Sequence, residues 1–192
     1  YPRIVQVAQS VIGREIREQS MEQEGRLPNM LIACCGGGSN LIGMIHEFLD
    51  EPEIIKIGVE AAETAALSNG TPGIMQGMKT YMLQTDDGSK SLGGSSLGAG
   101  IQYFSVGPQH AFLKDQGVVK YTSATDKEIL EAYKLIASTE GICSALEPMA
   151  GAAELIKQAK NKPKDYLICL NLCGTGEKDL NTIQEHIGKD FE

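Results

Sequence analysis

Three consecutive glycines, Gly36, Gly37 and Gly38, lie between the apolar run 30–35 and the apolar-periodic segment 41–49. This order predicts a buried strand, a tight glycine loop and a helix. Glycines turn the chain tightly and let several backbone N–H groups converge with no side chain in the way. Ser39 and Asn40 follow, and we expect them to add hydrogen-bond donors and an N-cap at the positive end of the helix. These five residues therefore predict a site for a phosphate group.

Two better-known phosphate motifs do not match this loop. A dinucleotide fingerprint that starts at Gly36 needs glycine at position 41, which is Leu41. A P-loop needs Gly-Lys-Ser/Thr, and no lysine lies between Cys35 and Leu49. The alternative that stays open is a strand-to-helix turn that binds no ligand. Phosphate binding is favoured over it, because three glycines weaken a turn that has no other use for them.

Regular spacing of apolar residues over most of the chain predicts alternating strands and helices. We expect strands over 30–35, 54–59, 118–122 and 166–172, and helices over 3–24, 40–50, 109–113, 125–139, 151–160 and 178–187. This alternation predicts an α/β fold with a mostly parallel sheet that helices cover on both faces. Periodicity fades over 61–104, where Gly, Ser and Thr are frequent. A long loop-rich region is expected there, and such regions are usually functional or mobile.

A second glycine loop, Cys173-Gly174-Thr175-Gly176, follows the last predicted strand. Ligands of parallel sheets bind at the carboxyl ends of the strands, where both glycine loops are expected to lie. Two interpretations stay open for the second loop: a plain turn, or one wall of a pocket that it shares with the first loop.

Composition excludes some classes of partner. The chain has 192 residues, and its 25 acidic and 17 basic side chains give a net charge of -8. This charge argues against nucleic acid or an anionic membrane as the main partner. No apolar run approaches a transmembrane span and no signal peptide is evident, so we expect a cytoplasmic protein. The five cysteines are odd in number and show no C-x-x-C spacing, which indicates free thiols rather than disulfides or a zinc site.

Six segments occur in an order that resembles one enzyme family, the tryptophan synthase beta chain. They are Glu24-Gly25-Arg26-Leu27-Pro28, Gly36-Gly37-Gly38-Ser39-Asn40, Ile57-Gly58-Val59-Glu60, Ser105-Val106-Gly107-Pro108-Gln109-His110, Ala145-Leu146-Glu147, and Asn171-Leu172 followed by Gly174, Gly176, Lys178 and Asp179. The resemblance covers the whole present sequence and about the C-terminal half of a family member. It implies the C-terminal domain of a fold-type-II pyridoxal-phosphate enzyme, with residues 1–192 as a single cofactor-binding domain of a longer parent chain.

The resemblance also implies an activity and its partners. The parent would be a lyase that condenses L-serine with indole to L-tryptophan through a pyridoxal-phosphate aminoacrylate. It would bind a tryptophan synthase alpha chain or domain and a second beta chain. In the family the Schiff-base lysine lies upstream of the segment that matches Tyr1, so the chain alone is expected to be inactive.

Individual residues take roles from the same resemblance. Glu147 matches a glutamate near the cofactor ring, although the residues alone favour a solvated glutamate before a helix. Cys173 replaces a serine that faces the pyridine nitrogen. The resemblance assigns the cup for the cofactor phosphate to Gly36, Gly37, Gly38, Ser39 and Asn40. It also assigns a site for a monovalent cation, Na or K, to the backbone carbonyls of Ile101, Tyr103 and Ser105.

Two departures from the family pattern keep alternatives open. Gln102 stands where many members have an aspartate that helps to close the site over serine, and the thiol of Cys173 is a weaker donor than a hydroxyl. One alternative is another fold-type-II β-replacement enzyme that uses a different nucleophile. The other is a non-catalytic module that binds a phosphate ligand or a partner.

Overall fold

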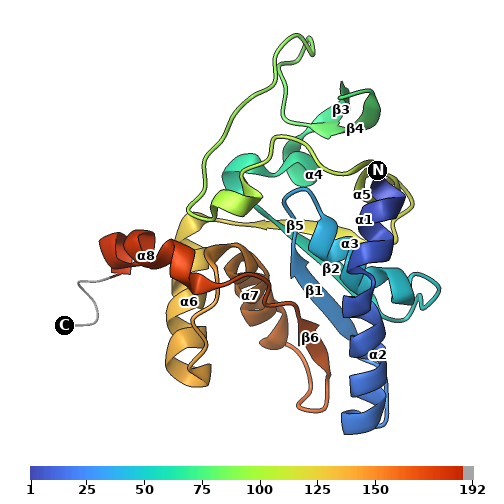
Figure 1. The fold of residues 1–192 in the computed structure, drawn as a ribbon, viewed down its shortest axis with the longest axis vertical. Coiled ribbons are helices and arrows are strands. Elements are labelled where there is room, and N and C mark those ends of the chain that lie inside the picture. The colour runs from blue at the N-terminus through green and yellow to red at the C-terminus, as the bar shows by residue number, and fades with distance from the viewer. Residues whose placement is uncertain (188–192) are drawn as a thin grey trace.

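A four-stranded parallel sheet forms the centre of the molecule in a computed structural model that describes residues 1–187 (Figure 1). The strand order is β5-β2-β1-β6, and every neighbouring pair is parallel. The predicted α/β fold is therefore confirmed, whereas the last part of the expected domain, 188–192, lies outside the described residues. The strand bounds are β1 Met30–Cys34, β2 Ile55–Ala61, β5 Lys120–Ala124 and β6 Ile168–Leu170.

Strand β1 is the most deeply buried element, because it lies between two strands and between two layers of helices. All five of its residues are buried, as expected of a strand covered on both faces. Met30 pairs with Ile55 on one side and with Ile168 on the other. Alternate side chains of β1 pack into two separate cores, one on each face of the sheet. Burial of each large apolar side chain there stabilises the folded state by roughly 1.5–3 kcal/mol.

Helices cover both faces of the sheet (Figure 1). On one face α6, α7 and α8 pack against the core that contains Met30 and Ile32. On the other face α2, α3 and α5 pack against the core that contains Leu31 and Ala33. No helix among the described residues is long and apolar enough to cross a membrane. The helix bounds are α2 Val11–Glu24, α3 Ser39–Ile45, α5 Pro108–Asp115, α6 Asp126–Glu140, α7 Leu146–Ala159 and α8 Leu180–Ile187.

The largest departures from the expected helix bounds lie in two places. The segment 3–24 is two helices, α1 Pro2–Gln9 and α2, which meet at Ser10. Helix α7 begins at Leu146, five residues before the expected start at Gly151. Pro148 obscures this start in the sequence. Proline is nevertheless tolerated in the first turn, because the backbone N–H that it lacks would have no acceptor within the helix there.

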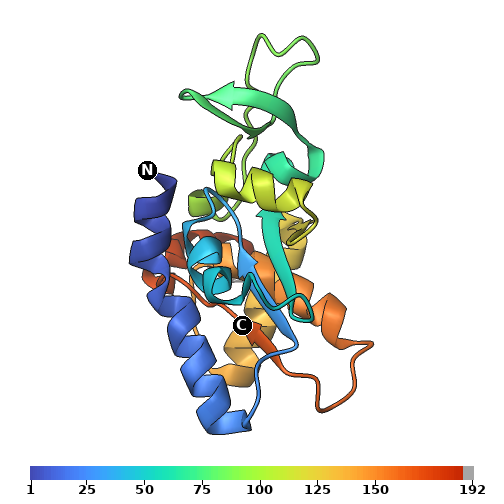
Figure 2. The ribbon, with the colours of Figure 1, turned by 90° about the vertical axis from the view of Figure 1, so that its right-hand side faces the viewer.

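The region 61–104 contains more regular structure than the sequence predicts. Helix α4 (Ala66–Asn69) leads into an antiparallel hairpin, β3 (Thr71–Met75) and β4 (Met78–Met82), which projects from the body of the molecule (Figure 2). Within the region expected to be rich in loops, residues 66–82 thus contain a helix and a hairpin that the sequence did not predict. The turn residues Gln76 and Gly77 both have positive φ, 48° and 79°, and glutamine is not the residue that normally signals such a turn. Residues 84–95 have no helix or strand beyond one isolated bridge.

Candidate cofactor site

The two glycine loops meet at one cavity, where strands β1 and β6 end. The cavity has a volume of about 190 Å³, and all five residues of the first loop line it. Cys173 and Gly174 of the second loop form another part of its wall, together with Glu147 and Lys178. The plain-turn interpretation of the second loop is therefore wrong, because both loops border the same space.

The three glycines of the first loop differ in the space around them. At Gly38, φ is +95° and a Cβ would overlap the imidazole of His110. At Gly36 a Cβ would lie 2.7 Å from the carbonyl oxygen of Gly100. At Gly37 a Cβ would meet no atom within 4 Å. The loop is thus closely packed at Gly36 and Gly38 and open at Gly37, so a ligand can approach its backbone there.

Helix α3 begins at Ser39, so the N–H groups of its first turn have no acceptor within the helix. The expected capping by Ser39 or Asn40 does not occur, because Gly38 is the N-cap and no side chain caps the helix. Asn40 instead donates from Nδ2 to the Cys34 carbonyl at 3.1 Å and accepts at Oδ1 from Asn171, also at 3.1 Å. Its side chain therefore connects the ends of β1 and β6, and the loop offers backbone donors to a ligand.

His110 packs against the first loop and forms a hydrogen bond to it. Its ring is only 2% exposed, with Nε2 2.7 Å from the carbonyl oxygen of Gly38 and Nδ1 2.8 Å from the hydroxyl of Tyr121. Burial lowers the pKa of His110 to about 4, and its hydrogen bond to the Gly38 carbonyl opposes this shift without cancelling it. The neutral ring then donates to the carbonyl and accepts from the tyrosine. Sequence reasoning placed His110 in a family segment but gave it no role.

Glu147 lies in the first turn of α7 and is 7% exposed, so the solvated glutamate favoured by the residues alone is wrong. Its Oε1 accepts from the Gly100 N–H at 2.6 Å and from Lys178 Nζ at 2.8 Å. Burial raises the pKa of Glu147, but these two donors outweigh burial and hold the pKa below its ordinary value. Its Oε2 is buried and has no hydrogen-bond partner in the structure. The cavity thus has an ionised carboxylate with one acceptor atom unused.

Lys178 lies in the last of the family segments, but the sequence does not predict it as a site residue. Its ammonium lies 2.8 Å from both Glu147 Oε1 and Asp179 Oδ1. Burial lowers the pKa of Lys178, but hydrogen bonds to Asp179 and Glu147 outweigh it and keep the pKa above its ordinary value. Asp179 in turn accepts from the N–H of Leu146, the first residue of α7. A lysine–aspartate pair one residue after the second glycine loop was the available signal in the sequence.

The segment expected to bind a cation packs against the first loop. A Cβ on Gly36 would lie 3.0 Å from the Cα of Ile101 and 3.3 Å from the ring of Tyr103. The carbonyl of Ile101 accepts a hydrogen bond from the Thr64 hydroxyl at 2.9 Å. Ser105 forms an isolated antiparallel bridge with Met82 of β4. Within residues 1–187 no group of three or more His, Cys, Asp or Glu side chains could hold a metal ion.

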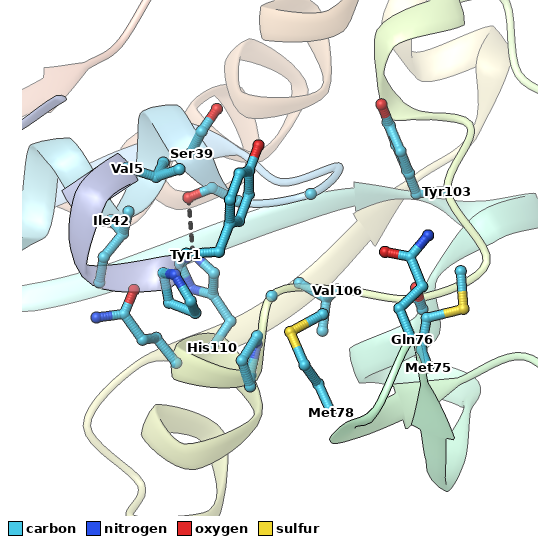
Figure 3. Close-up of a pocket in the computed structure, with 17 residues that line it drawn as sticks. Tyr1, Val5, Ser39, Ile42, Met75, Gln76, Met78, Tyr103, Val106 and His110 are labelled. Atoms are coloured by element: carbon cyan, nitrogen blue, oxygen red, sulfur yellow. Dashed lines mark hydrogen bonds between the residues drawn. The ribbon is translucent and has the colours of Figure 1, made fainter. Parts of the chain in front are cut away.

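A second cavity, of about 370 Å³, also borders the first loop (Figure 3). Met75 and Met78 of the hairpin line one side of it, and Ser39 and His110 line the other. The dashed line in Figure 3 marks the hydrogen bond from His110 to the Gly38 carbonyl. Gly37, Gly38 and Ser39 border both cavities.

Residues 1–174 match the family described as pyridoxal-phosphate dependent enzyme, and the chain belongs to that family. Its curated relatives include proteins named tryptophan synthase beta chain, which confirms the resemblance drawn from the motifs. That of Dinoroseobacter shibae is 47% identical over 200 residues, which are 100% of this chain and 48% of the relative. That of Rhodopseudomonas palustris is 48% identical over 198 residues, which are 100% of this chain and 49% of the relative. The chain spans about half the length of the curated relatives it matches.

Solved structures support the fold alone. A threonine deaminase from T.th. has a TM-score of 0.64 at 18% identity, over 88% of this chain and 57% of that one. A ligand-bound mutant of O-ureido-L-serine synthase has a TM-score of 0.62 at 17% identity, over 90% of this chain and 47% of that one. Both share the architecture of the present chain.

Proposed function

We propose that this chain is the cofactor-binding half of a tryptophan-synthase-beta-like lyase, which condenses L-serine with indole to L-tryptophan. The observation that carries the proposal is the cavity where the first glycine loop faces Glu147 and Cys173. Its residues fit pyridoxal phosphate. Gly37 leaves the loop backbone open to a phosphate, and the ionised carboxylate of Glu147 lines the same cavity.

In this proposal each side of the cavity has its own task. Gly36, Gly37, Gly38, Ser39 and Asn40 bind the phosphate through backbone N–H groups at the start of α3. Glu147 stays ionised beside the ring because Lys178 and Gly100 donate to it. Cys173 faces the pyridine nitrogen, where its thiol is a weak hydrogen-bond donor. When bound, the cofactor supplies the electron sink for bonds at the α-carbon of the substrate.

The rest of the enzyme would come from outside the present chain. The cavity of about 190 Å³ is smaller than the roughly 300–1,000 Å³ of complete small-molecule pockets. Helix α1 exposes Ile4 and Val7 to 71% and 61%, an apolar surface that further chain would cover. The proposal places the Schiff-base lysine in an upstream half, so the chain alone is inactive. An alpha chain or domain and a second beta chain complete the assembly, and carbonyls of Ile101, Tyr103 and Ser105 contribute to a Na or K site.

Another β-replacement enzyme of the same fold type is the second candidate. Gln102 favours it, because this exposed residue donates from Nε2 to the Ser96 carbonyl and supplies no carboxylate. A different nucleophile would then replace indole, while the phosphate loop and Glu147 would keep their tasks.

The deciding experiment compares the 192-residue chain with the protein that includes the upstream sequence. Both are incubated with pyridoxal phosphate, L-serine and indole, and L-tryptophan is measured by chromatography. We expect no turnover by the chain alone and turnover once the upstream half is present. Turnover with other nucleophiles but not with indole would support the second candidate. Reproducible turnover by the chain alone would contradict the assignment of the lysine, and no turnover by either protein would favour a non-catalytic module.

A further inference from the structure

Two cysteines lie beside each other at the wall of the cavity. The Sγ atoms of Cys34 and Cys173 are 3.6 Å apart, and both residues line the cavity. All five cysteines of the chain are free thiols in the structure. Cys34 ends strand β1, whereas Cys173 begins the second glycine loop, so residues far apart in sequence form a dithiol.

The two sulfur atoms already lie on the same side of the sheet. Ile32 of β1 pairs with Leu170 of β6, and the Asn171 N–H donates to the Ile32 carbonyl at 2.9 Å. Beyond this point the alternation of a strand ends, because Leu172 and Cys173 are consecutive and yet both pack against the core that contains Cys34. The Cys173 side chain thus contacts Cys34, with the sulfur atoms 3.6 Å apart. A bond between them needs a movement of about 1.5 Å, which side-chain rotation can supply.

The two thiols have different exposure and acidity. Cys34 is 1% exposed, whereas Cys173 is half-buried at the cavity. A hydrogen bond from the Cys34 thiol to the Cys173 sulfur lowers the pKa of Cys173 and raises that of Cys34, which burial raises further. Since the thiolate is the attacking species, Cys173 is the accessible nucleophile and Cys34 the second, buried thiol.

We propose that Cys173 and Cys34 form a thiol–disulfide exchange site that accepts a low-molecular-weight disulfide such as oxidised glutathione. The Cys173 thiolate attacks one sulfur of the small disulfide, a mixed disulfide forms, and one small thiolate leaves. The Cys34 thiol then gives its proton to that thiolate, and the resulting Cys34 thiolate attacks Cys173 Sγ, which releases the second small thiolate. This second thiolate takes up the proton that the Cys173 thiol had given to water. The protein dithiol is oxidised by two electrons, and the small disulfide is reduced to two thiols.

Oxidation would change the cavity as well as the cysteines. The sulfur atoms must close from 3.6 Å to about 2.05 Å, which draws Cys173 toward the end of β1 and fixes the second loop there. The thiol also stops being a hydrogen-bond donor. The consequence for pyridoxal phosphate rests on the proposed function: the oxidised chain would bind the cofactor less tightly than the reduced chain.

Thiol counting and peptide mapping test the exchange site directly. The 192-residue chain is incubated with oxidised glutathione, checked for its fold by circular dichroism, and then denatured under acid quench. We expect the thiols of Cys34 and Cys173 to be lost together and a peptide that links Cys34 to Cys173 to be found by mass spectrometry, whereas the exposed Cys143 can carry only a mixed disulfide with glutathione, which the map distinguishes. In Cys34→Ala glutathione should remain attached to Cys173, and in Cys173→Ser the Cys34 thiol should stay free. The exposed Cys143 offers the matched control, because Cys143→Ser should leave the link unchanged.

The peptide map of disulfide links in the wild-type chain tests the exchange site even where a variant fails to fold. A stable mixed disulfide on Cys173 with Cys34 still reduced would overturn it, as would a link between Cys34 and Cys35. Equilibrium dialysis with pyridoxal phosphate then tests the consequence, with at least tenfold weaker binding expected for the oxidised chain and recovery in dithiothreitol. Equal binding by both forms would overturn the effect on the cofactor. A reduced chain that forms the link but does not bind pyridoxal phosphate would overturn the proposed cofactor site and leave the exchange site supported.

Discussion

His110 holds the third glycine of the phosphate-type loop, because its Nε2 lies 2.7 Å from the carbonyl oxygen of Gly38. The other ring nitrogen lies 2.8 Å from the hydroxyl of Tyr121 on β5. A neutral imidazole therefore connects the sheet to a loop residue whose φ is +95°. The shape of the loop and the protonation of His110 are therefore coupled.

The free energy of unfolding should fall as the pH drops below about 6.5. The pKa of His110 is about 4 in the folded chain and about 6.5 in an ordinary setting, so only the unfolded chain takes up the proton between these values. The difference in pKa contributes about 3 kcal/mol to the free energy of unfolding. This contribution is fully present above pH 6.5 and is lost as the pH falls to 4. Urea unfolding at pH 7.5 and pH 5 should show about 2 kcal/mol of this loss, and His110→Gln should reduce it. His186 is exposed and gives the control variant His186→Gln. An NMR titration that finds His110 protonating near pH 6.5 would contradict the account.

Gly38→Ala should lower the free energy of unfolding by roughly 2 kcal/mol or more. A positive φ disfavours any side chain at this position, and the new methyl group would overlap the His110 ring. Gly37→Ala is the matched control, since its methyl group would meet no atom within 4 Å. Urea unfolding of the two variants at pH 7.5 makes the comparison. Equal stability of the two variants would show that the loop is not held as described.

Borohydride reduction of the chain with pyridoxal phosphate should label no single lysine stoichiometrically. Lys178 is the decisive residue, because it lines the cavity but is held as an ammonium by Asp179 and Glu147. A protonated amine is a poor nucleophile toward an aldehyde. Peptide mapping after reduction measures the label at each lysine. One equivalent of label on Lys178 would place the cofactor-anchoring lysine in this chain and overturn the proposed division of the site.

Amide hydrogen exchange should be faster over 61–104 than in β1 and β6, and fastest over 84–95. Residues 84–95 have few buried side chains and little regular backbone pairing, so little apolar burial opposes their entropy. Leu67 and Thr64 are buried, which should slow exchange around them. Addition of the upstream half with cofactor should slow exchange over 84–95 far more than in β1. If 84–95 were protected as well as β1 in the chain alone, this segment would have stable packing of its own.

The sheet and its two glycine loops were predictable because their signals are local. Strand β1 is a run of five apolar residues, and Gly36, Gly37 and Gly38 follow it directly. The hairpin β3–β4 was missed because Pro72 and Gly73 interrupt its alternation and Gln76 occupies the turn. Elements with a continuous pattern could be predicted, and those whose pattern is short or interrupted could not.

The polar part of the candidate site was less predictable because its contacts join distant residues. Glu147 is buried against Lys178, 31 residues further along the chain, and nothing near Glu147 in the sequence indicates this pairing. Cys34 and Cys173 are 139 residues apart, and only the pairing of β1 with β6 brings them together. The capping expected of Asn40 does not occur for the same reason, because Asn171, on a distant segment, donates a hydrogen bond to the side-chain oxygen of Asn40.

An NMR titration tests most directly the central claim that the backbone of residues 36–40 binds phosphate. Inorganic phosphate and pyridoxal phosphate are added to the wild-type chain, Gly37→Ala and Gly37→Asp, and the loop amides are followed. Gly37→Ala should bind like the wild type because the position is open, whereas Gly37→Asp places a carboxylate where the anion would lie. The account predicts loop amide shifts at millimolar ligand in the wild type and Gly37→Ala, and none in Gly37→Asp. Loop amides that stay unshifted in the wild type at these concentrations would contradict it.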